Sequence, residues 1–369
     1  LWELKTIVNF VLEIGTGKSE YIINDYSIKN SFPILGSTSI IGFDNSFDYS
    51  GDFILTARVG ANAGEIYKYS GEAKITDNTV YIKSNCLDYL YYSLLHYNLK
   101  RLSFGTGQPL IKTSELKKIK IFFPSSLEQT AIGTLFRTLD DLLASYKDNL
   151  ANYQSLKATM LSKMFPKAGQ TVPEIRLDGY KGEWDLIKLG DFCDLITKGT
   201  TGKSQSEQGK VNFVKVENLK DNEIYPIVKI SEEEHFGSLK RSILYEGDIL
   251  FSIAGTLGRT AIVKNNILPA NTNQALAIIR GYKLDAYFLL VVLSGEVVKD
   301  YIRKNPTVGA QPNLSLEQVS SLKIKIPSLE EQQAIGAYFS NLDNLINSYQ
   351  DKISQLETLK KKLLQDMFI

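Results

Sequence analysis

Two glycine-rich turns are the first stretches of this chain with residue types that could perform chemistry. Residues 15–19 read Gly-Thr-Gly-Lys-Ser, and residues 199–204 read Gly-Thr-Thr-Gly-Lys-Ser. A phosphate-binding P-loop needs a further glycine five residues before its Gly-Lys pair, and those positions hold Leu12 and Thr197. The pattern argues against an ATPase. It leaves two interpretations open, a turn whose lysine contacts a phosphate and a solvated loop.

The other reactive residue types form no catalytic constellation. The histidines His96 and His235 and the cysteines Cys86 and Cys193 are scattered, so they predict neither a zinc site nor a disulfide framework, and they fit a reducing cytosol. Acidic residues 233–234 are typical of a solvated face. The chain has no nucleophile elbow, no Asn-Pro-Pro-Tyr-type methylation motif and no glycine fingerprint for a nucleotide cofactor. We therefore expect a non-catalytic protein without a bound metal.

Length and charge limit the class of protein further. The 369 residues are too many for a single core and suit two domains with connecting helices. Lys+Arg number 42 and Asp+Glu 41, so any surface that binds an anionic polymer must be local. The longest purely apolar run, residues 288–293, is far too short to span a membrane. We expect a soluble, cytoplasmic protein.

The elements that position these residues are organised around a duplicated segment. Residues 124–165 occur again, without a gap, as residues 327–368, at a constant offset of 203 (327 − 124). Each copy opens with Pro-Ser and a glutamate three residues after the serine, which is the capping box of a helix start. The segments 124–165 and 327–369 are therefore predicted to be two helices of about 40 residues, roughly 60 Å long.

Apolar residues at alternating steps of three and four predict a seam along each helix. One slot in each copy is irregular, at Asn149 with Leu150 and at Lys352 with Ile353. The natural partner of each seam is the other copy; the alternative is that each helix packs on its own globular domain. The predicted seam consists of Ile132, Leu135, Leu139, Leu142, Tyr146, Tyr153, Leu156, Ile335, Leu342, Leu345, Tyr349, Leu356 and Leu359.

Residues 1–123 and 184–326 are predicted to be two versions of one mixed α/β domain, joined through a linker at 166–183. Trp184 corresponds to Trp2, Gly247 to Gly51 and Gln311 to Gln108, at offsets that drift while the order is kept. Short runs such as 53–56, 79–82 and 119–123 predict strands, and 87–102 predicts one amphipathic helix. The chain starts without methionine, and we expect that residues upstream of Leu1 are missing.

These features together resemble the specificity (S) subunit of type I restriction-modification systems along nearly the whole chain. The resemblance is carried by the repeated Trp-x-Leu openings at Trp2 and Trp184, by the Gly-Asp strands at residues 51–52 and 247–248, and by the helix openings PSSLEQTAIG and PSLEEQQAIG. Leu-Asp pairs at 139–140 and 342–343 and two Met-Phe endings complete the pattern.

The resemblance implies a non-catalytic reader of bipartite double-stranded DNA. Each globular unit would be a target recognition domain for one half-site, and the two helices would form an antiparallel coiled coil that sets the spacer. The fold class implied is α+β, with two pseudo-symmetric domains. Two methyltransferase (M) subunits and restriction (R) subunits would be the partners. S-adenosylmethionine, ATP and magnesium would belong to them, with no cofactor bound by this chain.

Loops that differ between the two domains predict an asymmetric target. Arg58 and Arg259 each follow a Gly-Asp strand, where a guanidinium is able to bind guanine with two hydrogen bonds. The alternative for each candidate is an ordinary surface charge or, for the glutamines, a loop cap. The candidate DNA contacts are Lys18, Arg58, Asn62, Lys68, Lys74, Asn78 and Gln108 in the first domain, and Lys198, Lys203, Lys215, Arg241, Arg259, Asn273 and Gln311 in the second.

Two other functions are alternatives to DNA recognition. The chain is alternatively an interaction scaffold, or a regulatory paralogue whose domains no longer bind DNA. A self-sufficient DNA methyltransferase with fused recognition domains is argued against by the missing catalytic motifs.

Overall fold

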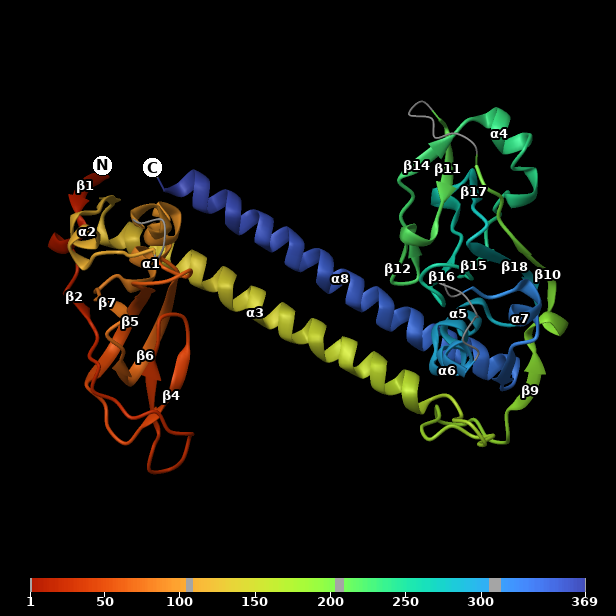
Figure 1. The fold of residues 1–369 in the computed structure, drawn as a ribbon, viewed down its shortest axis with the longest axis horizontal. Coiled ribbons are helices and arrows are strands. Elements are labelled where there is room, and N and C mark those ends of the chain that lie inside the picture. Colours follow the sequence, from red (N-terminus) through yellow and green to blue (C-terminus); the bar gives the residue numbers. More distant parts are fainter. Residues whose placement is uncertain (1, 104–108, 203–208, 305–312, 369) are drawn as a thin grey trace. The chain divides into compact units, whose positions relative to one another are not determined.

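The structure of the chain, a computed structural model, describes residues 2–103, 109–202, 209–304 and 313–368. Contacts divide it into two compact units, unit 1 (Leu1–Asp148 with Tyr349–Ile369) and unit 2 (Asn149–Ser348). Both divisions fall inside long helices, α3 (Ser126–Lys163) and α8 (Leu329–Met367). Each unit therefore contains one globular domain with a part of both helices (Figure 1).

The domain of unit 1 is built on a six-stranded sheet with the strand order β2-β7-β5-β6-β3-β4, and β1 and β8 form a separate two-stranded sheet. Every pairing is antiparallel except that of β3 with β6. Its elements are β1 (Glu3–Thr6), η1 (Ile7–Asn9), β2 (Glu13–Thr16), β3 (Phe32–Leu35), β4 (Ile40–Asp44), β5 (Tyr49–Ala57), β6 (Ile66–Ile75), β7 (Thr79–Lys83), α1 (Leu87–Tyr97), η2 (Leu99–Leu102), α2 (Thr113–Lys118) and β8 (Lys120–Phe123).

The central strands of this sheet have two buried faces. Along β5, Ile54 belongs to the core that includes α1, whereas Phe53 and Leu55 belong to a second core on the opposite face. On β7, Ile82 and Tyr81 are divided in the same way. Because successive side chains of a strand point to opposite faces, a continuous apolar run is what a strand covered on both sides requires.

The helix predicted at 87–102 is wrong in its last five residues, 98–102. α1 ends at Tyr97, and Asn98 adopts a left-handed conformation with φ of 58°. Its side-chain oxygen accepts from the amide of Lys100 at 3.3 Å and starts the 3₁₀ turn η2. Asparagine tolerates this conformation better than most residues because its short amide bonds the local backbone.

The domain of unit 2 distributes its strands over smaller sheets, with the orders β10-β18-β15-β16, β14-β11-β17, β12-β13 and β19-β9. Its elements are β9 (Asp185–Lys188), η3 (Leu189–Phe192), β10 (Cys193–Lys198), β11 (Val211–Val214), η4 (Val216–Asn218), β12 (Leu219–Lys220), β13 (Glu223–Ile224), β14 (Val228–Ile230), α4 (Glu232–Phe236), η5 (Lys240–Ser242), β15 (Ile249–Ser252), β16 (Thr260–Ile262), η6 (Asn265–Ile267), β17 (Ala270–Thr272), β18 (Leu276–Tyr282), α5 (Ala286–Ser294), α6 (Glu296–Lys304), α7 (Leu316–Ser320) and β19 (Lys323–Ile326).

The apolar run that is too short for a membrane is the buried helix α5 of this domain. All residues from Phe288 to Leu293 are buried in the larger core of unit 2. Asp285 caps the helix, because its carboxylate accepts from the amide of Phe288 at 2.9 Å. The run is apolar on every side because the domain surrounds it.

The predicted capping boxes of the two long helices are only half formed. The hydroxyl of Ser125 accepts from the amide of Glu128 at 3.3 Å, and that of Ser328 accepts from Glu331 at 3.4 Å. The glutamate side chains do not return to the serine backbone. Glu128 instead accepts from the indole N–H of Trp2 in the first domain, and Glu331 binds Arg176 in the linker that precedes the second domain.

Candidate nucleic-acid interface

Loops at one end of the sheet in unit 1 are held together by backbone hydrogen bonds. The amide of Gly17 donates to the carbonyl of Thr79 at 3.0 Å, and the amide of Arg58 donates to that of Asn78 at 3.0 Å. The carbonyl of Arg58 accepts from the amide of Ile111 at 2.8 Å. We define the first loop cluster as residues 17–19, 36–38, 58–64 and 76–79.

Four predicted contact residues lie in the first loop cluster. Lys18, Asn62 and Asn78 are exposed, and Arg58 is half-buried. The hydroxyl of Ser37 donates to the carbonyl of Asn78 at 3.3 Å and joins the neighbouring turn to them. Two cations beside two amides supply the donors and acceptors that phosphates and base edges require. Gln108 lies outside the described residues.

The other two candidate lysines of unit 1 are neutralised by carboxylates. Lys68 Nζ lies 2.6 Å from Asp88. The side chain of Lys74 is only 12% exposed, and its Nζ lies 3.5 Å from Asp48 and 4.0 Å from Asp44. Both side chains hold the domain together, and neither is presented to a ligand as an unpaired charge.

Unit 2 repeats the same backbone bonds with different side chains. The amide of Gly199 donates to the carbonyl of Leu276 at 3.1 Å, and the amide of Ile253 to that of Ala275 at 2.9 Å. The carbonyl of Ile253 accepts from Leu314 at 2.8 Å. Gly199 thus corresponds to Gly17, Ile253 to Arg58 and Ala275 to Asn78. The second loop cluster comprises residues 199–202, 215–218, 253–259 and 272–275.

The two glycines are needed for the same reason. A Cβ at Gly17 would overlap the carbonyl oxygens of Ile75 and Thr76, and one at Gly199 would overlap those of Thr272 and Asn273. Only glycine allows the neighbouring strand to approach this closely. Gly17 and Gly199 are therefore equivalent backbone positions, and the close approach of the neighbouring strand accounts for glycine at both.

The correspondence separates residues whose local sequences look alike. Thr200 follows Gly199 where Lys18 follows Gly17, so the two Gly-Lys-Ser motifs are not equivalent, and Ile253 takes the place of Arg58. Loop insertions of different length bring similar letters to different backbone positions. Arg259 instead donates through Nη1 to the carbonyls of Val216 and Leu219 at 3.2 and 3.4 Å.

Two of the remaining candidates of unit 2, Lys215 and Asn273, lie in the second loop cluster, and Lys198 and Arg241 lie outside it. Lys198 is exposed at the end of β10, beside the second loop cluster, and Arg241 is exposed on η5. Lys215 is half-buried, and the Asn273 side chain accepts from the amide of Ala275 at 3.2 Å. Lys203 and Gln311 lie outside the described residues.

Unit 2 also places polar residues in its loop cluster that were not predicted from the sequence. Thr200 and Thr201 follow Gly199, and the hydroxyl of Thr201 donates to the side-chain oxygen of Gln274 at 2.8 Å. Gln274 is exposed and is able to bond a base edge. Their position at the ends of strands, Gly199 after β10 and Gln274 between β17 and β18, was the sequence feature by which they could have been predicted.

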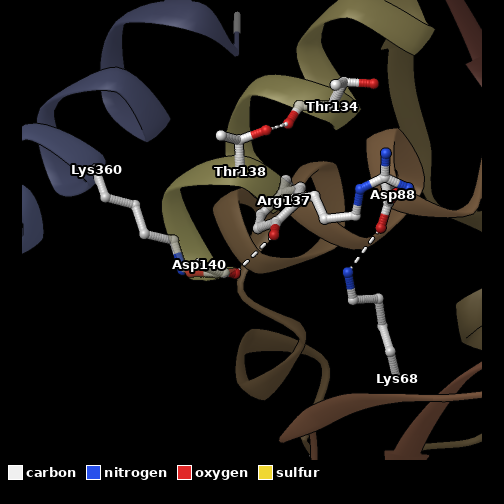
Figure 2. Close-up of polar contacts among 8 residues, drawn as sticks. Lys68, Asp88, Thr134, Arg137, Thr138, Asp140 and Lys360 are labelled. Atoms are coloured by element: carbon white, nitrogen blue, oxygen red, sulfur yellow. Dashed lines mark hydrogen bonds and ion pairs between the residues drawn. The ribbon is translucent and has the colours of Figure 1, made fainter. Parts of the chain in front are cut away.

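An ionic network joins the domain of unit 1 to both long helices. Asp88 on α1 binds Lys68 on β6 and, at 3.3 Å, Arg137 on α3. Asp140 on α3 accepts from the hydroxyl of Tyr92 at 2.6 Å and from Lys360 on α8. Figure 2 shows Lys68 reaching Asp88 and Lys360 reaching Asp140. Four elements, β6, α1, α3 and α8, are thereby joined to one another.

Burial affects the protonation of this network. Tyr92 is buried, and its burial, together with the hydrogen bond to Asp140, raises the pKa of its phenol. The tyrosine therefore stays a neutral hydrogen-bond donor at neutral pH. The neighbouring Tyr89 also has its pKa raised by burial, to about 12.

The helices run antiparallel within each unit. In unit 1, Lys147 of α3 lies 2.7 Å from Glu357 of α8, and Asp140 binds Lys360, so the numbers rise along one helix and fall along the other. In unit 2, Lys157 lies 2.5 Å from Asp343. The Asp140–Lys360 and Asp343–Lys157 pairs are related by the repeat offset (343 − 140 and 360 − 157 are both 203).

The predicted seam is divided between buried and exposed positions. Ile132, Leu139, Ile335 and Leu342 are buried. Tyr146, Tyr153, Tyr349 and Leu356 are half-buried, and Tyr146 packs on Tyr349 with ring centroids 5.5 Å apart. Five predicted positions lie outside the buried stripe, with exposures between 38% and 45%: Leu135, Leu142, Leu156, Leu345 and Leu359.

The buried stripe is rotated towards the globular domains. Its unpredicted members include Phe136, Leu143, Phe339 and Ile346. The ring of Phe136 lies 4.8 Å from that of Tyr92 on α1. Because each helix packs on its own domain as well as on the other helix, an ideal two-helix heptad predicts the buried face only in part.

Neither a metal site nor a membrane span is present in the described part of the chain. In residues 2–103, 109–202, 209–304 and 313–368, His, Cys, Asp and Glu side chains nowhere gather in the groups of three that a metal ion would need. The helices in these ranges include none that is both long and apolar enough to cross a bilayer.

The fold and the loop clusters define a class of protein with two copies of a recognition domain, each carried by part of an antiparallel helix pair. The family described as type I restriction modification DNA specificity domain matches residues 6–152 and 181–358. These two matches cover most of the chain, once for each domain. The chain belongs to this family of type I restriction-modification DNA specificity proteins.

Individual relatives agree with the family assignment. The type I restriction enzyme MjaVIII specificity subunit of Methanocaldococcus jannaschii is 26% identical over 389 residues, covering 98% of this chain and 91% of the relative. The EcoBI specificity subunit of Escherichia coli is 24% identical over 315 residues, covering 76% and 64%. A type I restriction-modification S subunit from M. genitalium has the same fold, with a TM-score of 0.69, 18% identity, and coverage of 100% and 96%.

Proposed function

We propose that this chain reads both halves of a bipartite DNA target for a type I restriction-modification complex. The observation that carries the proposal is the separate family match of each domain, at 6–152 and 181–358, together with a polar loop cluster in each. The chain itself is a non-catalytic specificity subunit. An interaction scaffold that does not bind DNA is not favoured by this match.

The two loop clusters support an asymmetric target. Equivalent backbone positions carry Lys18 and Arg58 in one cluster and Thr200 and Ile253 in the other. Base edges are distinguished by the donors and acceptors that a protein presents, so different side chains select different bases. The two half-sites are therefore expected to differ in sequence.

The long helices are proposed to set the spacer between the half-sites. α3 has 38 residues and α8 has 39. Adding or removing one helical turn moves an attached group by about 5.4 Å, which exceeds the roughly 3.4 Å step of one base pair. A change in helix length is therefore expected to change the spacer.

The catalytic work is assigned to partner subunits. Two M subunits with S-adenosylmethionine and R subunits with ATP and magnesium are the proposed partners in the cytoplasm, and this chain is expected to bind no cofactor of its own. The near balance of 42 basic and 41 acidic residues is consistent with phosphate contacts shared with partners.

Methylome sequencing tests the proposal. A strain that expresses the M subunit is compared with and without this gene. The expected result is a bipartite methylated motif that disappears with the gene. An identical methylome in the two strains would show that the chain does not direct methylation.

A further inference from the structure

One pair of equivalent backbone positions, Arg58 in the first domain and Ile253 in the second, carries a cation in one domain and an apolar side chain in the other. Arg58 and Ile253 both donate their amide to a facing loop and accept at their carbonyl from the strand-like segment that follows, at 2.8 to 3.0 Å. Ile253 is only 3% exposed and belongs to the main core of unit 2. The packing at this position thus suits an apolar side chain, and unit 1 places a guanidinium there.

The buried end of the Arg58 side chain has no compensating contact. Its Nε is buried and has no hydrogen-bond partner among the described residues. A buried N–H without a partner is unfavourable for folding. Arginine at this position is therefore poorly explained by the stability of the domain.

The outer end of the same side chain is available to a ligand. Within the described residues, the two terminal nitrogens of Arg58 form no hydrogen bond and no ion pair, and neither is a buried unsatisfied atom. The nearby Asp77 is exposed and does not pair with Arg58. The Arg58 side chain is therefore buried as far as Nε, while the two terminal nitrogens of its guanidinium reach the surface.

The backbone beside Arg58 is fixed. Its amide and carbonyl are both bonded, the amide of Gly60 donates to the carbonyl of Pro109 at 3.0 Å, and the amide of Ala63 donates to the carbonyl of Gly60 at 3.0 Å. A fixed backbone places a guanidinium with the accuracy that two parallel hydrogen bonds require. Arg259 lacks this freedom because backbone carbonyls already occupy its Nη1.

We propose that Arg58 is a base-reading residue that binds a guanine in the half-site of the first domain through two hydrogen bonds to O6 and N7. The second domain, with Ile253 at the same position, reads no guanine from there. The inference rests on the proposed function, and it adds the residue and the base. A phosphate oxygen offers similar acceptors, so the experiment must distinguish base from phosphate.

The test compares the methylomes directed by the wild-type chain, Arg58→Met and Arg58→Lys, each expressed in full length with the M subunit. Methionine keeps an apolar stem that suits the site of its counterpart Ile253, and lysine keeps the charge without the fork. We expect the wild-type motif to contain a guanine whose preference falls by roughly 5- to 150-fold in Arg58→Met. The other half of the motif should be unchanged.

Arg137→Met is the matched control, because it removes the same charge from the same unit at a side chain that binds Asp88, 3.3 Å away. Its motif should keep every base. Thermal melting checks that each variant is folded, and if Arg58→Met fails to fold, Arg58→Lys alone must show the loss of guanine preference.

Three results would overturn the assignment. A uniform fall in methylation with an unchanged motif would mean that Arg58 contacts a phosphate or only stabilises the domain. Loss of a base preference in the half-site of the second domain would mean that Arg58 does not read the half-site of the first domain. A wild-type chain that directs no motif would instead refute the proposed function, and the inference with it.

Discussion

A tryptophan and a glutamate recur where each long helix begins, as Trp2 and Glu128 in unit 1 and as Trp184 and Glu331 in unit 2, but their hydrogen-bond partners differ. In unit 1, Trp2 donates from Nε1 to Glu128 at 3.0 Å near the surface. In unit 2, Glu331 is 2% exposed and binds both Nε and Nη2 of Arg176, at 2.8 and 2.7 Å. The indole N–H of Trp184 is buried there without a hydrogen-bond partner in the part of the chain that the structure describes.

The difference comes from the segment before β9. Arg176 lies in the predicted linker, and its guanidinium also donates to the carbonyls of Lys181 and Gly182 at 3.0 and 2.6 Å. A repeated glutamate has thus exchanged an indole partner for a buried, two-point ion pair. Glu128 and Glu331 occupy the same position of the repeat, but each contributes to stability through a different partner, Trp2 for one and Arg176 for the other.

The largest expected effect comes from exchanging one domain. Replacing residues 184–326 with the second domain of another family member should replace one half of the methylated motif and leave the other half intact, because the hydrogen bonds of each loop cluster lie within its own domain. Methylome sequencing of the chimaera measures both halves. Simultaneous changes in the two halves would contradict independent reading.

The two junction glutamates should differ strongly in stability. Glu331→Gln breaks a buried ion pair and is expected to destabilise unit 2 by about 3 to 5 kcal/mol. Glu128→Gln removes only a charge, because the amide oxygen of glutamine still accepts from the exposed indole N–H, and it should cost about 1 kcal/mol or less. Denaturant unfolding of the two variants is the comparison, and equal losses would show that burial does not separate the junctions.

The thiol of Cys193 allows the effect of Glu331→Gln on unit 2 to be measured separately from unit 1. Burial raises the pKa of Cys193 to about 11, so its thiol is neutral and reacts slowly near pH 8 while the unit is folded. Unfolding returns the thiol to its ordinary, lower pKa and exposes it. Labelling of Cys193 should therefore accelerate in Glu331→Gln and stay close to wild type in Glu128→Gln.

The aromatic residues that end the two repeats should act on different units. Phe368 is 7% exposed and lies against Tyr89, Phe136 and His96, with ring centroids 5.7 to 5.8 Å apart. Phe368→Ala should destabilise unit 1 by about 3 kcal/mol. Phe165→Ala, at the equivalent repeat position among Trp184, Phe288 and Phe339, should affect unit 2. Cys193 labelling separates the two outcomes.

The smallest expected effect concerns the ion pair between the helices of unit 1. Lys360→Met removes the partner of Asp140, whose side chain is 35% exposed, and should cost about 1 kcal/mol. Lys157→Met is its repeat-related counterpart, facing the less exposed Asp343, and should cost somewhat more. Thermal melting at low and high salt checks both, since screening should reduce each difference.

The sequence predicted the architecture because its strongest signals are long and repeated. The two helix segments, the two-domain α+β class and strands such as β5 and β7 follow from repeat spacing and apolar runs. The break at Asn98 was missed because the apolar pattern of 87–102 continues past it, and a single left-handed residue leaves little trace in periodicity.

The candidate site was less predictable. Arg58 and Arg259 have similar local sequences, as do Lys18 and Lys203, whereas backbone hydrogen bonds make Arg58 equivalent to Ile253 and Lys18 equivalent to Thr200. Backbone hydrogen bonds between loops that are far apart in sequence establish which positions are equivalent. These bonds depend on how the strands pair, and loop insertions of different length hide that pairing in the sequence. The same applies to Lys68 and Lys74, whose carboxylate partners are remote in sequence.

The position of Phe368 also has a consequence for the order in which the chain is completed during synthesis. Phe368 follows its contact Phe136 by 232 residues (368 − 136), and at about 5 to 20 residues per second translation needs roughly 10 to 50 s to cover that interval. The first domain leaves the ribosome before Phe368, the residue that follows α8, has been made. Its aromatic core lacks this ring until then. A nascent chain of this kind needs protection from aggregation for the whole of that interval, and any product that stops short of Phe368 leaves its first domain unfinished.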